Sequence, residues 1–319
     1  MEKKNMYVTI FGATGFIGSH VAEQFRLQGY EVTTPVRKNS DTSLLQSLNC
    51  QICEVDFNSD ASIKAAIVEN SIVYNCIAAL NTDVAEDTIR SVEVDLTRRI
   101  IRLAKAKGAS GYIQLSSIIS YGHNLPIYAI NEDYPQNPEF ILDKLSLERE
   151  TAVKTICQEV KLPFIILQPV STIGTRARGN SFSTLIDMYK EGEFPLVSGG
   201  KAGVSLIDTR DVGRCMIWLG ENMQTLAEQT FLLKGFDTTW LEFKQTLDRA
   251  NAKENKAKNI PFWLLNMLGF IGEKRPGNPL MSRRVAGLLG KNKLYQDTRI
   301  RESGFVPIYT LEDAVAQVL

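Results

Sequence analysis

The sequence predicts an α/β protein with a doubly wound parallel sheet and a smaller C-terminal substrate lobe. Two observations lead to this fold class. Short apolar, β-rich runs alternate with segments of helical period through the first half of the chain, and a glycine-rich turn follows the first run. Because the apolar runs are nearly continuous, the strands are expected to be buried on both faces, as in a parallel sheet.

The elements follow one another as strand, helix, strand. Six strands are predicted from β-branched and apolar runs, at Tyr7–Phe11, Glu31–Val36, Gln51–Val55, Ile72–Cys76, Tyr112–Leu115 and Phe164–Leu167. Helical periodicity between them predicts helices at Gly15–Gln28, Ser43–Leu48, Ala61–Val68, Val84–Lys107 and Pro138–Val160.

The pattern loosens after Pro169, where glycine-rich turns separate scattered short elements. Helices are predicted there at Ser181–Lys190, Val212–Asn222, Thr239–Ala250, Pro261–Gly272, Ser282–Leu289 and Leu311–Val318. We therefore expect a first domain over residues 1–170. Residues 171–319 are expected to form mainly a substrate-binding lobe that closes over the carboxyl ends of the strands, with some segments returning to the sheet.

Composition excludes several functional classes. Among the 319 residues, 36 basic side chains balance 36 acidic ones, which implies no bulk attraction to nucleic acid or to an anionic membrane. The longest apolar segment, Ile260–Gly272, is interrupted and too short to span a bilayer. With no export signal recognised and five cysteines, we expect a cytoplasmic protein with reduced thiols. Cys50 and Cys53 are spaced as CxxC, but strand packing explains them better than a metal site.

A glycine-rich turn joins the first strand to the first helix. Gly12, Gly15 and Gly18 are spaced GxxGxxG, which suits a tight turn, close approach of a pyrophosphate to the helix N-terminus, and close packing of helix on strand. The turn predicts that residues 1–170 form a Rossmann-type domain that binds a dinucleotide; the alternative is a glycine-rich turn needed only for packing. The remaining residues of the turn expected at the cofactor are Thr14, Phe16 and Ile17.

With these features the chain resembles the extended short-chain dehydrogenase/reductase superfamily, the NAD-dependent epimerases, dehydratases and reductases. The likeness covers essentially the whole chain. Besides the glycine turn, the matching segments are Val55-Asp56-Phe57, Asn75 to Ala79, Leu115-Ser116-Ser117 with Tyr121-Gly122, Lys144 with Glu148, Leu167-Gln168-Pro169, Ile207 to Val212 and Asp297 to Ala314.

The resemblance implies further contacts with the cofactor. Asp56 should bond the adenine amino group beside Phe57, although a capping or turn role would also explain an aspartate there. Ala78 and Ala79 should leave room for the cofactor after the fourth strand, and Lys144 and Pro169 should lie against it.

The end of the second strand predicts which dinucleotide is bound. NAD-binding relatives carry an acid there for the ribose 2′-hydroxyl, whereas this chain has Arg37 and Lys38, which could meet a 2′-phosphate. We therefore favour NADP, with NAD as the alternative. The alternative to a phosphate contact is that Arg37 and Lys38 simply lie in a loop exposed to solvent.

The catalytic set implied by the resemblance is incomplete. The family uses a serine or threonine, a proton-transferring tyrosine and a lysine four residues later. Ser117 and Lys144 match, but Phe140 stands at the tyrosine position within an otherwise preserved YxxxKxxxE spacing. A phenyl ring has no ionisable proton to transfer, so turnover is in doubt. Tyr121 is a candidate substitute, as are Lys144 with a water and the loop residues Glu132, Asp133 and Tyr134.

Two further segments depart from patterns in the family. Glu93 lies where relatives usually have an asparagine, and a surface acid on a helix is the commoner explanation of a glutamate. Ile118 and Ile119 follow Ser117, where 4,6-dehydratases carry an Asp-Glu pair, so dehydratase chemistry is disfavoured.

Two hypotheses about function remain. The first is an NAD(P)-dependent reductase, dehydrogenase or epimerase-like enzyme for a nucleotide sugar or another carbonyl or hydroxyl compound. The second is a dinucleotide-binding regulatory or sensor protein without turnover. The resemblance also implies a homodimer through the long helices Val84–Lys107 and Pro138–Val160. Candidate contacts for a substrate diphosphate are Arg176, Arg178, Arg210 and Arg214.

Overall fold

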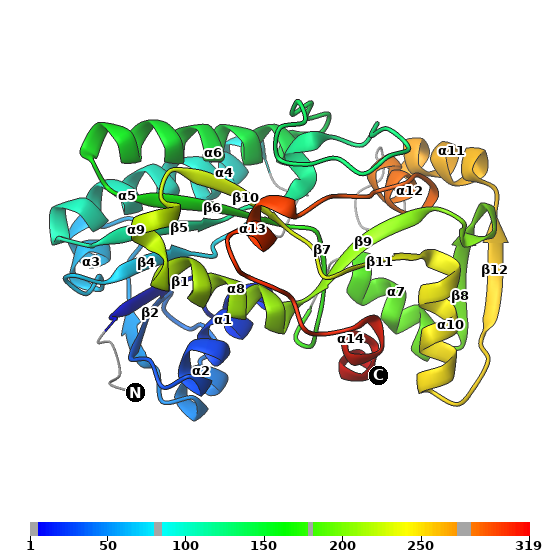
Figure 1. The fold of residues 1–319 in the computed structure, drawn as a ribbon, viewed down its shortest axis with the longest axis horizontal. Helices are drawn as coiled ribbons and strands as arrows, with labels where there is room; N and C mark the ends of the chain where they lie inside the picture. The colour runs from blue at the N-terminus through cyan, green and yellow to red at the C-terminus, as the bar shows by residue number, and fades with distance from the viewer. Residues whose placement is uncertain (1–5, 80–84, 178–180, 273–281) are drawn as a thin grey trace.

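The computed structural model describes residues 6–79, 85–177, 181–272 and 282–319. A seven-stranded, fully parallel sheet forms its larger part, in the order β10-β6-β5-β4-β1-β2-β3 (Figure 1). The strands are β1 Val8–Phe11, β2 Val32–Val36, β3 Gln51–Glu54, β4 Ile72–Asn75, β5 Gly111–Leu115, β6 Phe164–Pro169 and β10 Gln229–Leu233. The prediction of a doubly wound parallel sheet is confirmed.

The six predicted strands are all present, each within two residues of its predicted bounds. The seventh strand, β10, was not predicted from the sequence. It comes from beyond residue 170 and pairs with β6 from Gln229 opposite Ile165 to Leu233 opposite Pro169. Residues on both sides of Pro169 therefore build the same sheet.

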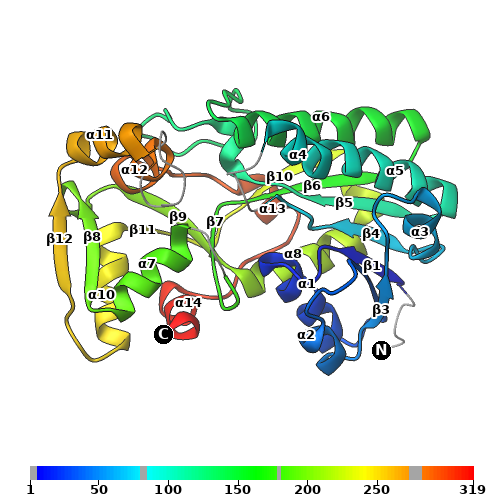
Figure 2. The ribbon, with the colours of Figure 1, turned by 180° about the vertical axis from the view of Figure 1, so that it is seen from behind.

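Helices cover both faces of this sheet (Figures 1 and 2). One apolar layer packs under α1 and α8, which contact each other closely, and a second packs under α3, α5 and α6. The helices of the larger part are α1 Phe16–Leu27, α2 Ser43–Ser47, α3 Asp60–Ala65, α4 Glu86–Arg90, α5 Leu96–Lys107, α6 Ile141–Val160, α8 Thr209–Glu221, α9 Met223–Leu226 and α13 Thr298–Glu302.

The helix predicted from Val84 to Lys107 contains an irregular turn. Val84 lies outside the described residues, and from Glu86 the chain is helical through α4, a π-helical turn at Ser91–Asp95 and α5. It ends at Gly108, whose φ of 84° closes the helix with a left-handed residue. Glu93 and Val94 are the buried residues of this π-helical turn.

The smaller lobe has its own core. It contains a three-stranded sheet, β11-β9-β7, and a parallel pair, β12-β8, which pack with helices around Trp240, Phe194 and Phe243. Its elements are β7 Ser171–Ile173, α7 Ser181–Lys190, β8 Glu193–Val197, β9 Gly203–Asp208, β11 Phe236–Thr239, α10 Trp240–Ala250, β12 Lys256–Ile260, α11 Phe262–Gly272, α12 Arg283–Gly290 and α14 Leu311–Val318.

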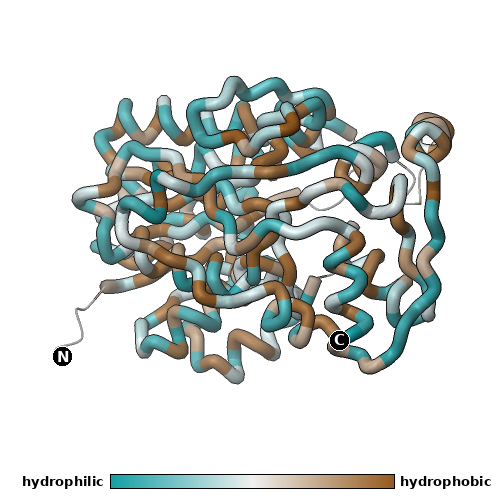
Figure 3. Tube along the Cα trace, turned by 45° about the vertical axis from the view of Figure 1, so that its right-hand side comes forward, coloured by the Kyte–Doolittle hydropathy of each residue, from teal (hydrophilic) through white to brown (hydrophobic). Residues whose placement is uncertain are grey.

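The predicted apolar helix near Ile260–Gly272 is α11, which lies at the periphery of the smaller lobe (Figure 3). Trp263, Met267 and Phe270 are exposed on it. No helix among the described residues has both the length and the apolar character needed to cross a membrane.

Candidate functional site

The glycine turn lies at the carboxyl end of β1. Gly12 has a φ of +78°, and a side chain on it would bring Cβ within 2.7 Å of the Cys76 carbonyl carbon. A Cβ on Gly18 would overlap the Gly12 carbonyl oxygen, so Gly18 lets α1 pack closely against the turn. At Gly15 the nearest atom to an added Cβ is the Gly12 oxygen, at 3.2 Å. Gly12 and Gly18 thus fit the turn and the packing, whereas Gly15 faces more open space.

The N-terminus of α1 is suited to bind an anion. Gly15 is its extended N-terminal cap, no side chain caps the helix, and its first turn contains no acidic residue. The first N–H groups of a helix lack partners within the helix and carry a partial positive charge. These features fit the pyrophosphate of a dinucleotide. Thr14, Phe16 and Ile17 lie in or directly beside this turn, and Thr14 is exposed.

The ends of β2 and β3 present the predicted selectivity and adenine residues. Arg37 and Lys38 follow β2 and are exposed. Asp56 follows β3 and is also exposed, and its Oδ1 accepts a hydrogen bond of 2.9 Å from the Asn58 amide. Ser59, and not Asp56, caps α3. The turn occupies one oxygen of Asp56, and the exposed carboxylate can still accept a further donor.

The loop after β4 is held by a buried ion pair. Glu93 and Arg149 are 5% and 4% exposed and are paired. Glu93 Oε1 accepts a hydrogen bond of 2.6 Å from the Ala79 amide, and Arg149 donates to the Ile77 carbonyl at 3.3 Å. The interpretation of Glu93 as a surface acid is therefore wrong. Glu93 lies in the π-helical turn and points inward, where it fixes the loop that contains Ala78.

The three residues at the expected catalytic positions come from β5 and α6. Ser117 is the second residue after the end of β5, and its hydroxyl oxygen accepts a hydrogen bond of 3.4 Å from the Ile119 amide. Phe140 is the extended N-terminal cap of α6, and Lys144 is exposed on the first turn of that helix. The short 3₁₀ turn that follows Ser117 packs on α6, so both elements meet beyond the sheet's carboxyl edge.

Tyr121, the candidate substitute for the missing phenol, is part of a buried network. It is 2% exposed, and its hydroxyl donates to Gln168 Oε1 at 2.9 Å. Gln168 in turn donates to the buried Glu150, which also accepts from Ser116. Burial raises the pKa of Tyr121 well above its usual value. This hydroxyl is therefore occupied, and its raised pKa weighs against a role in proton exchange.

The other candidate substitutes face the C-terminal part of the chain. Glu132 accepts from the Leu232 amide at 2.8 Å, and Asp133 forms a 2.8 Å ion pair with Arg299. Tyr134 is half-buried against the core. The contacts of Glu132 and Asp133 help hold the segment before α6 against β10 and α13.

A histidine that sequence reasoning did not select lies beside Phe140. The His123 ring meets the Phe140 ring edge to face, with centroids 4.9 Å apart. His123 Nε2 is 3.1 Å from Oδ2 of Asp143, which is fully buried on the first turn of α6. Both residues are close in sequence to recognised positions, two residues after Tyr121 and one before Lys144, but their pairing depends on the fold.

A family model matches residues 8–232, from β1 to β10. The chain belongs to the NAD dependent epimerase/dehydratase family. Its fold is that of the extended short-chain dehydrogenase/reductases, as the sequence resemblance predicted.

Relatives within and around this family differ in their described roles. A mitochondrial NADH dehydrogenase [ubiquinone] 1 alpha subcomplex subunit 9 of Arabidopsis thaliana is 23% identical over 92% of this chain and 71% of its own. A photosystem II assembly factor of Trieres chinensis is 22% identical over 83% and 76%. A tyrosine-to-phenylalanine variant of UDP-glucuronic acid 4-epimerase from Bacillus cereus, in complex with a fluorinated UDP-glucuronic acid and NAD, shares the fold. Its TM-score is 0.78, at 18% identity over 98% and 97% of the two chains.

Three of the four arginines proposed as contacts for a substrate diphosphate are paired within the chain. Arg176 pairs with Glu23 on α1 at 2.7 Å. Arg210 pairs with Asp208 and stacks on Tyr309, and Arg214 pairs with Asp211. These contacts tie α1 and α8 to neighbouring segments. Arg178 lies outside the described residues.

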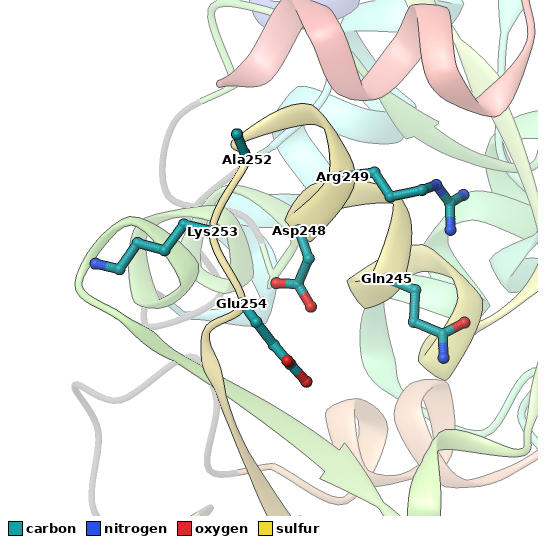
Figure 4. Close-up of a pocket in the computed structure, with 6 residues that line it drawn as sticks. All are labelled: Gln245, Asp248, Arg249, Ala252, Lys253 and Glu254. Carbon is teal, nitrogen blue, oxygen red and sulfur yellow. The ribbon is translucent and has the colours of Figure 1, made fainter.

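A surface hollow at the end of α10 lies away from the glycine turn and from Ser117. It is lined by Gln245, Asp248, Arg249, Ala252, Lys253 and Glu254 (Figure 4). Asp248 pairs there with Lys244 at 2.6 Å, and none of the family's expected site residues lines the hollow. In the described ranges, no three metal-ligating side chains gather in a group that could hold an ion.

Proposed function

We propose that this protein is a nicotinamide-dinucleotide-dependent oxidoreductase or epimerase that acts on a carbonyl or hydroxyl group of a small molecule. The observation that carries the proposal is the uncapped N-terminus of α1, which opens at Gly15 on the sheet edge where Ser117 also lies. The bound dinucleotide would supply or accept the hydride. Ser117 would hold the substrate oxygen by its hydroxyl, and Lys144, exposed on the first turn of α6, would bind the ribose.

A nucleotide sugar is the substrate class that we propose, and NADP the preferred cofactor. The Bacillus cereus variant of this fold binds NAD and a sugar nucleotide although a tyrosine has been replaced by phenylalanine. A phenylalanine is therefore compatible with both ligands in that protein. Exposed Arg37 and Lys38 at the end of β2 support NADP over NAD. Two isoleucines after Ser117 argue against 4,6-dehydration.

Calorimetric titration with NADP⁺ and NAD⁺ tests the dinucleotide site. We expect Gly15→Val to abolish binding, because its side chain would occupy the space through which the pyrophosphate approaches α1. Leu27→Val, at the exposed far end of α1, is the control and should bind normally. Circular dichroism establishes that both variants are folded. Unchanged affinity in folded Gly15→Val removes the basis of the proposal.

The second candidate function is a dinucleotide-binding regulatory or sensor protein. Phe140 motivates it, and the names of two relatives describe a respiratory-complex subunit and an assembly factor. Incubation with UDP-glucose or UDP-glucuronic acid and NAD(P)⁺, followed by chromatography for epimerised or oxidised sugar, separates the two candidates. Product favours the enzyme. Binding of dinucleotide without product from either sugar nucleotide favours the sensor.

We also propose a cytoplasmic location for this protein. All five cysteines are free, as expected in a reducing compartment such as the cytoplasm. Burial raises the pKa of Cys50 and Cys53, so their thiols are less ionised than ordinary thiols.

A further inference from the structure

We propose that His123, oriented by Asp143, carries the proton that the tyrosine phenol carries in the family. The inference rests on the proposed function and names a group that could transfer the proton although Phe140 cannot. The imidazole ring packs edge to face on Phe140, with 4.9 Å between centroids, and so lies beside the phenyl ring that stands at the tyrosine position. Imidazole is the side chain that most often moves protons near neutral pH.

Asp143 is placed to orient this imidazole. Its carboxylate is fully buried on the first turn of α6, and Oδ2 lies 3.1 Å from His123 Nε2 and 3.2 Å from the Phe140 amide, from which it accepts. A carboxylate accepts but cannot donate, so it holds the imidazole proton on Nε2. Asp143 thus acts as a positioning residue, like the aspartate of a Ser-His-Asp triad.

The second ring nitrogen is left for exchange. His123 Nδ1 is buried and has no hydrogen-bond partner among the described residues. Burying a ring nitrogen without a hydrogen-bond partner costs free energy of folding. A histidine that served only for packing would give nothing in return for this cost, so the unpaired nitrogen calls for an explanation. Held on Nε2 by Asp143, the proton leaves Nδ1 with a free lone pair. Because Nδ1 is buried against Gly287 on α12, the proposed proton transfer requires α12 to move aside and admit the substrate hydroxyl.

Charged groups from three other segments surround the pair. Lys293 donates to the carbonyl oxygens of Gly122 and His123, at 3.3 and 2.9 Å, and Glu139 accepts from the His123 amide at 2.8 Å. Arg284 on α12 interacts electrostatically with Asp143, and Lys291 bonds Asn124. The His123 backbone is therefore fixed from both sides.

The smaller lobe approaches the same histidine. A Cβ added to Gly287 on α12 would lie 3.8 Å from His123 Nδ1. The segment between Tyr121 and α6 extends from the sheet toward α12 in Figures 1 and 2. His123 thus lies at the seam between the two parts of the protein, where a substrate held by the smaller lobe would meet the sheet edge.

The proposed step couples a proton transfer to a hydride transfer. In oxidation, the substrate O–H bond breaks and its proton passes to His123 Nδ1, while the carbon loses a hydride to the oxidised nicotinamide and becomes a carbonyl. In reduction, the imidazolium would return the proton to the substrate oxygen, and the carbonyl carbon would take up the hydride that a bound reduced dinucleotide supplies. An epimerase would perform both halves in turn.

The first test reads the tautomer directly and needs no substrate. The chain contains two histidines, so ¹⁵N-resolved NMR of labelled protein shows two imidazoles, and His20→Gln assigns them. We expect neutral His123 to carry its proton on Nε2, and Asp143→Asn to convert it to a mixture of tautomers. A proton on Nδ1 in the wild type, or no change with Asp143→Asn, overturns the arrangement.

The second test measures turnover with UDP-glucuronic acid and UDP-glucose, each with NAD(P)⁺. His123→Gln should lower the rate roughly 10² to 10⁴-fold while leaving the dinucleotide Kd unchanged. Phe140→Tyr, which adds one oxygen, should restore activity in the His123→Gln background and add little to the wild type. Tyr7→Phe, at an exposed residue directly before β1, is the control and should behave as wild type.

The outcomes separate the two proposals. If the wild type binds no dinucleotide, the proposed function is wrong, while the NMR result on His123 stands independently. Normal turnover in His123→Gln, with dinucleotide bound, defeats the role of His123 alone. If the wild type binds dinucleotide but yields no product from either sugar nucleotide, the proton-carrying role is also rejected.

Discussion

Single side chains at the end of β2 are expected to select the dinucleotide. Arg37 and Lys38 are exposed there, and Arg37 can donate two hydrogen bonds to a 2′-phosphate. We expect Arg37→Asp to weaken NADP relative to NAD by about 10- to 100-fold, because an attractive contact becomes a repulsive one. Calorimetric Kd values for both dinucleotides give the ratio. Arg102→Asp, an exposed residue of α5, is the control. An unaltered ratio in Arg37→Asp excludes the contact.

Lys293 predicts a pH dependence of stability. Burial lowers the pKa of Lys293 from 10.5 to about 8, so between these values the unfolded chain binds a proton that the folded protein does not. Its contribution is therefore fully present above pH 10.5 and is lost as the pH falls toward 8. We expect the free energy of unfolding to rise with pH across this window, by up to about 1.4 kcal/mol per unit from this group.

Denaturant unfolding at several pH values measures that slope. Lys293→Met removes the titrating group and should flatten the slope, while Lys154→Met, at an exposed position on α6, should not. Equal slopes in wild type and Lys293→Met contradict the assignment. The absolute stability of Lys293→Met also reflects the loss of its bonds to two carbonyl groups, so the slope is the decisive quantity.

Residues that belong to a spaced motif could be predicted from the sequence, whereas partners that meet only in the fold could not. The spacing of Gly12, Gly15 and Gly18 predicts a tight turn and close helix packing, and Gly12 and Gly18 have that geometry. Glu93 looks like a surface residue because its partner Arg149 is 56 positions away. His123 shows no spacing to Asp143 that a helix or strand would predict, so its role had no local indication.

At the scale of elements, the Glu93–Arg149 pair joins the π-helical turn to α6 and to the loop after β4. Glu93→Ala leaves Arg149 buried without its partner, and we expect a loss of about 3–5 kcal/mol in unfolding free energy. Asp95→Ala is the matched control on the same turn: Asp95 pairs with Arg98 at the surface and should cost less than about 1 kcal/mol. Urea denaturation measures both, and equal losses would contradict the buried pair.

Elements in the first half could be predicted because each has a long, periodic pattern. The helix predicted at Ser181–Lys190 in the second half also matches α7. The strands of the smaller lobe could not be predicted, because several are short and lie among glycine-rich turns. β12, for example, is Lys256–Ile260 and is largely exposed, so its sequence lacks the apolar run that reveals a buried strand.

At the scale of the whole molecule, the two parts are interwoven. β10 comes from the second half and completes the sheet beside β6, and α8 packs against α1. Arg176 and His20 further join the segment after β7 to α1, with His20 Nε2 2.9 Å from the Thr175 carbonyl oxygen. Separating the chain at residue 170 would therefore remove an edge strand and a covering helix from the sheet.

A homodimer through α4, α5 and α6 is our prediction for the assembly, by resemblance to the family. These helices lie side by side over one face of the sheet (Figure 2). Arg90 and Arg98 both pair with Glu148 there, so a contact on this surface would be polar and weakened by salt. Sedimentation at micromolar concentration should show twice the chain mass, and raised salt should lower it.

Two variants identify the surface that forms this dimer. Arg98→Glu reverses a charge on the predicted contact and should shift the protein to monomer, whereas Trp263→Ser changes the exposed apolar face of α11 and should leave the dimer intact. The opposite pattern would assign association to α11, because exposed apolar patches often mark protein contacts. A wild-type protein that sediments only as monomer refutes the dimer through either surface.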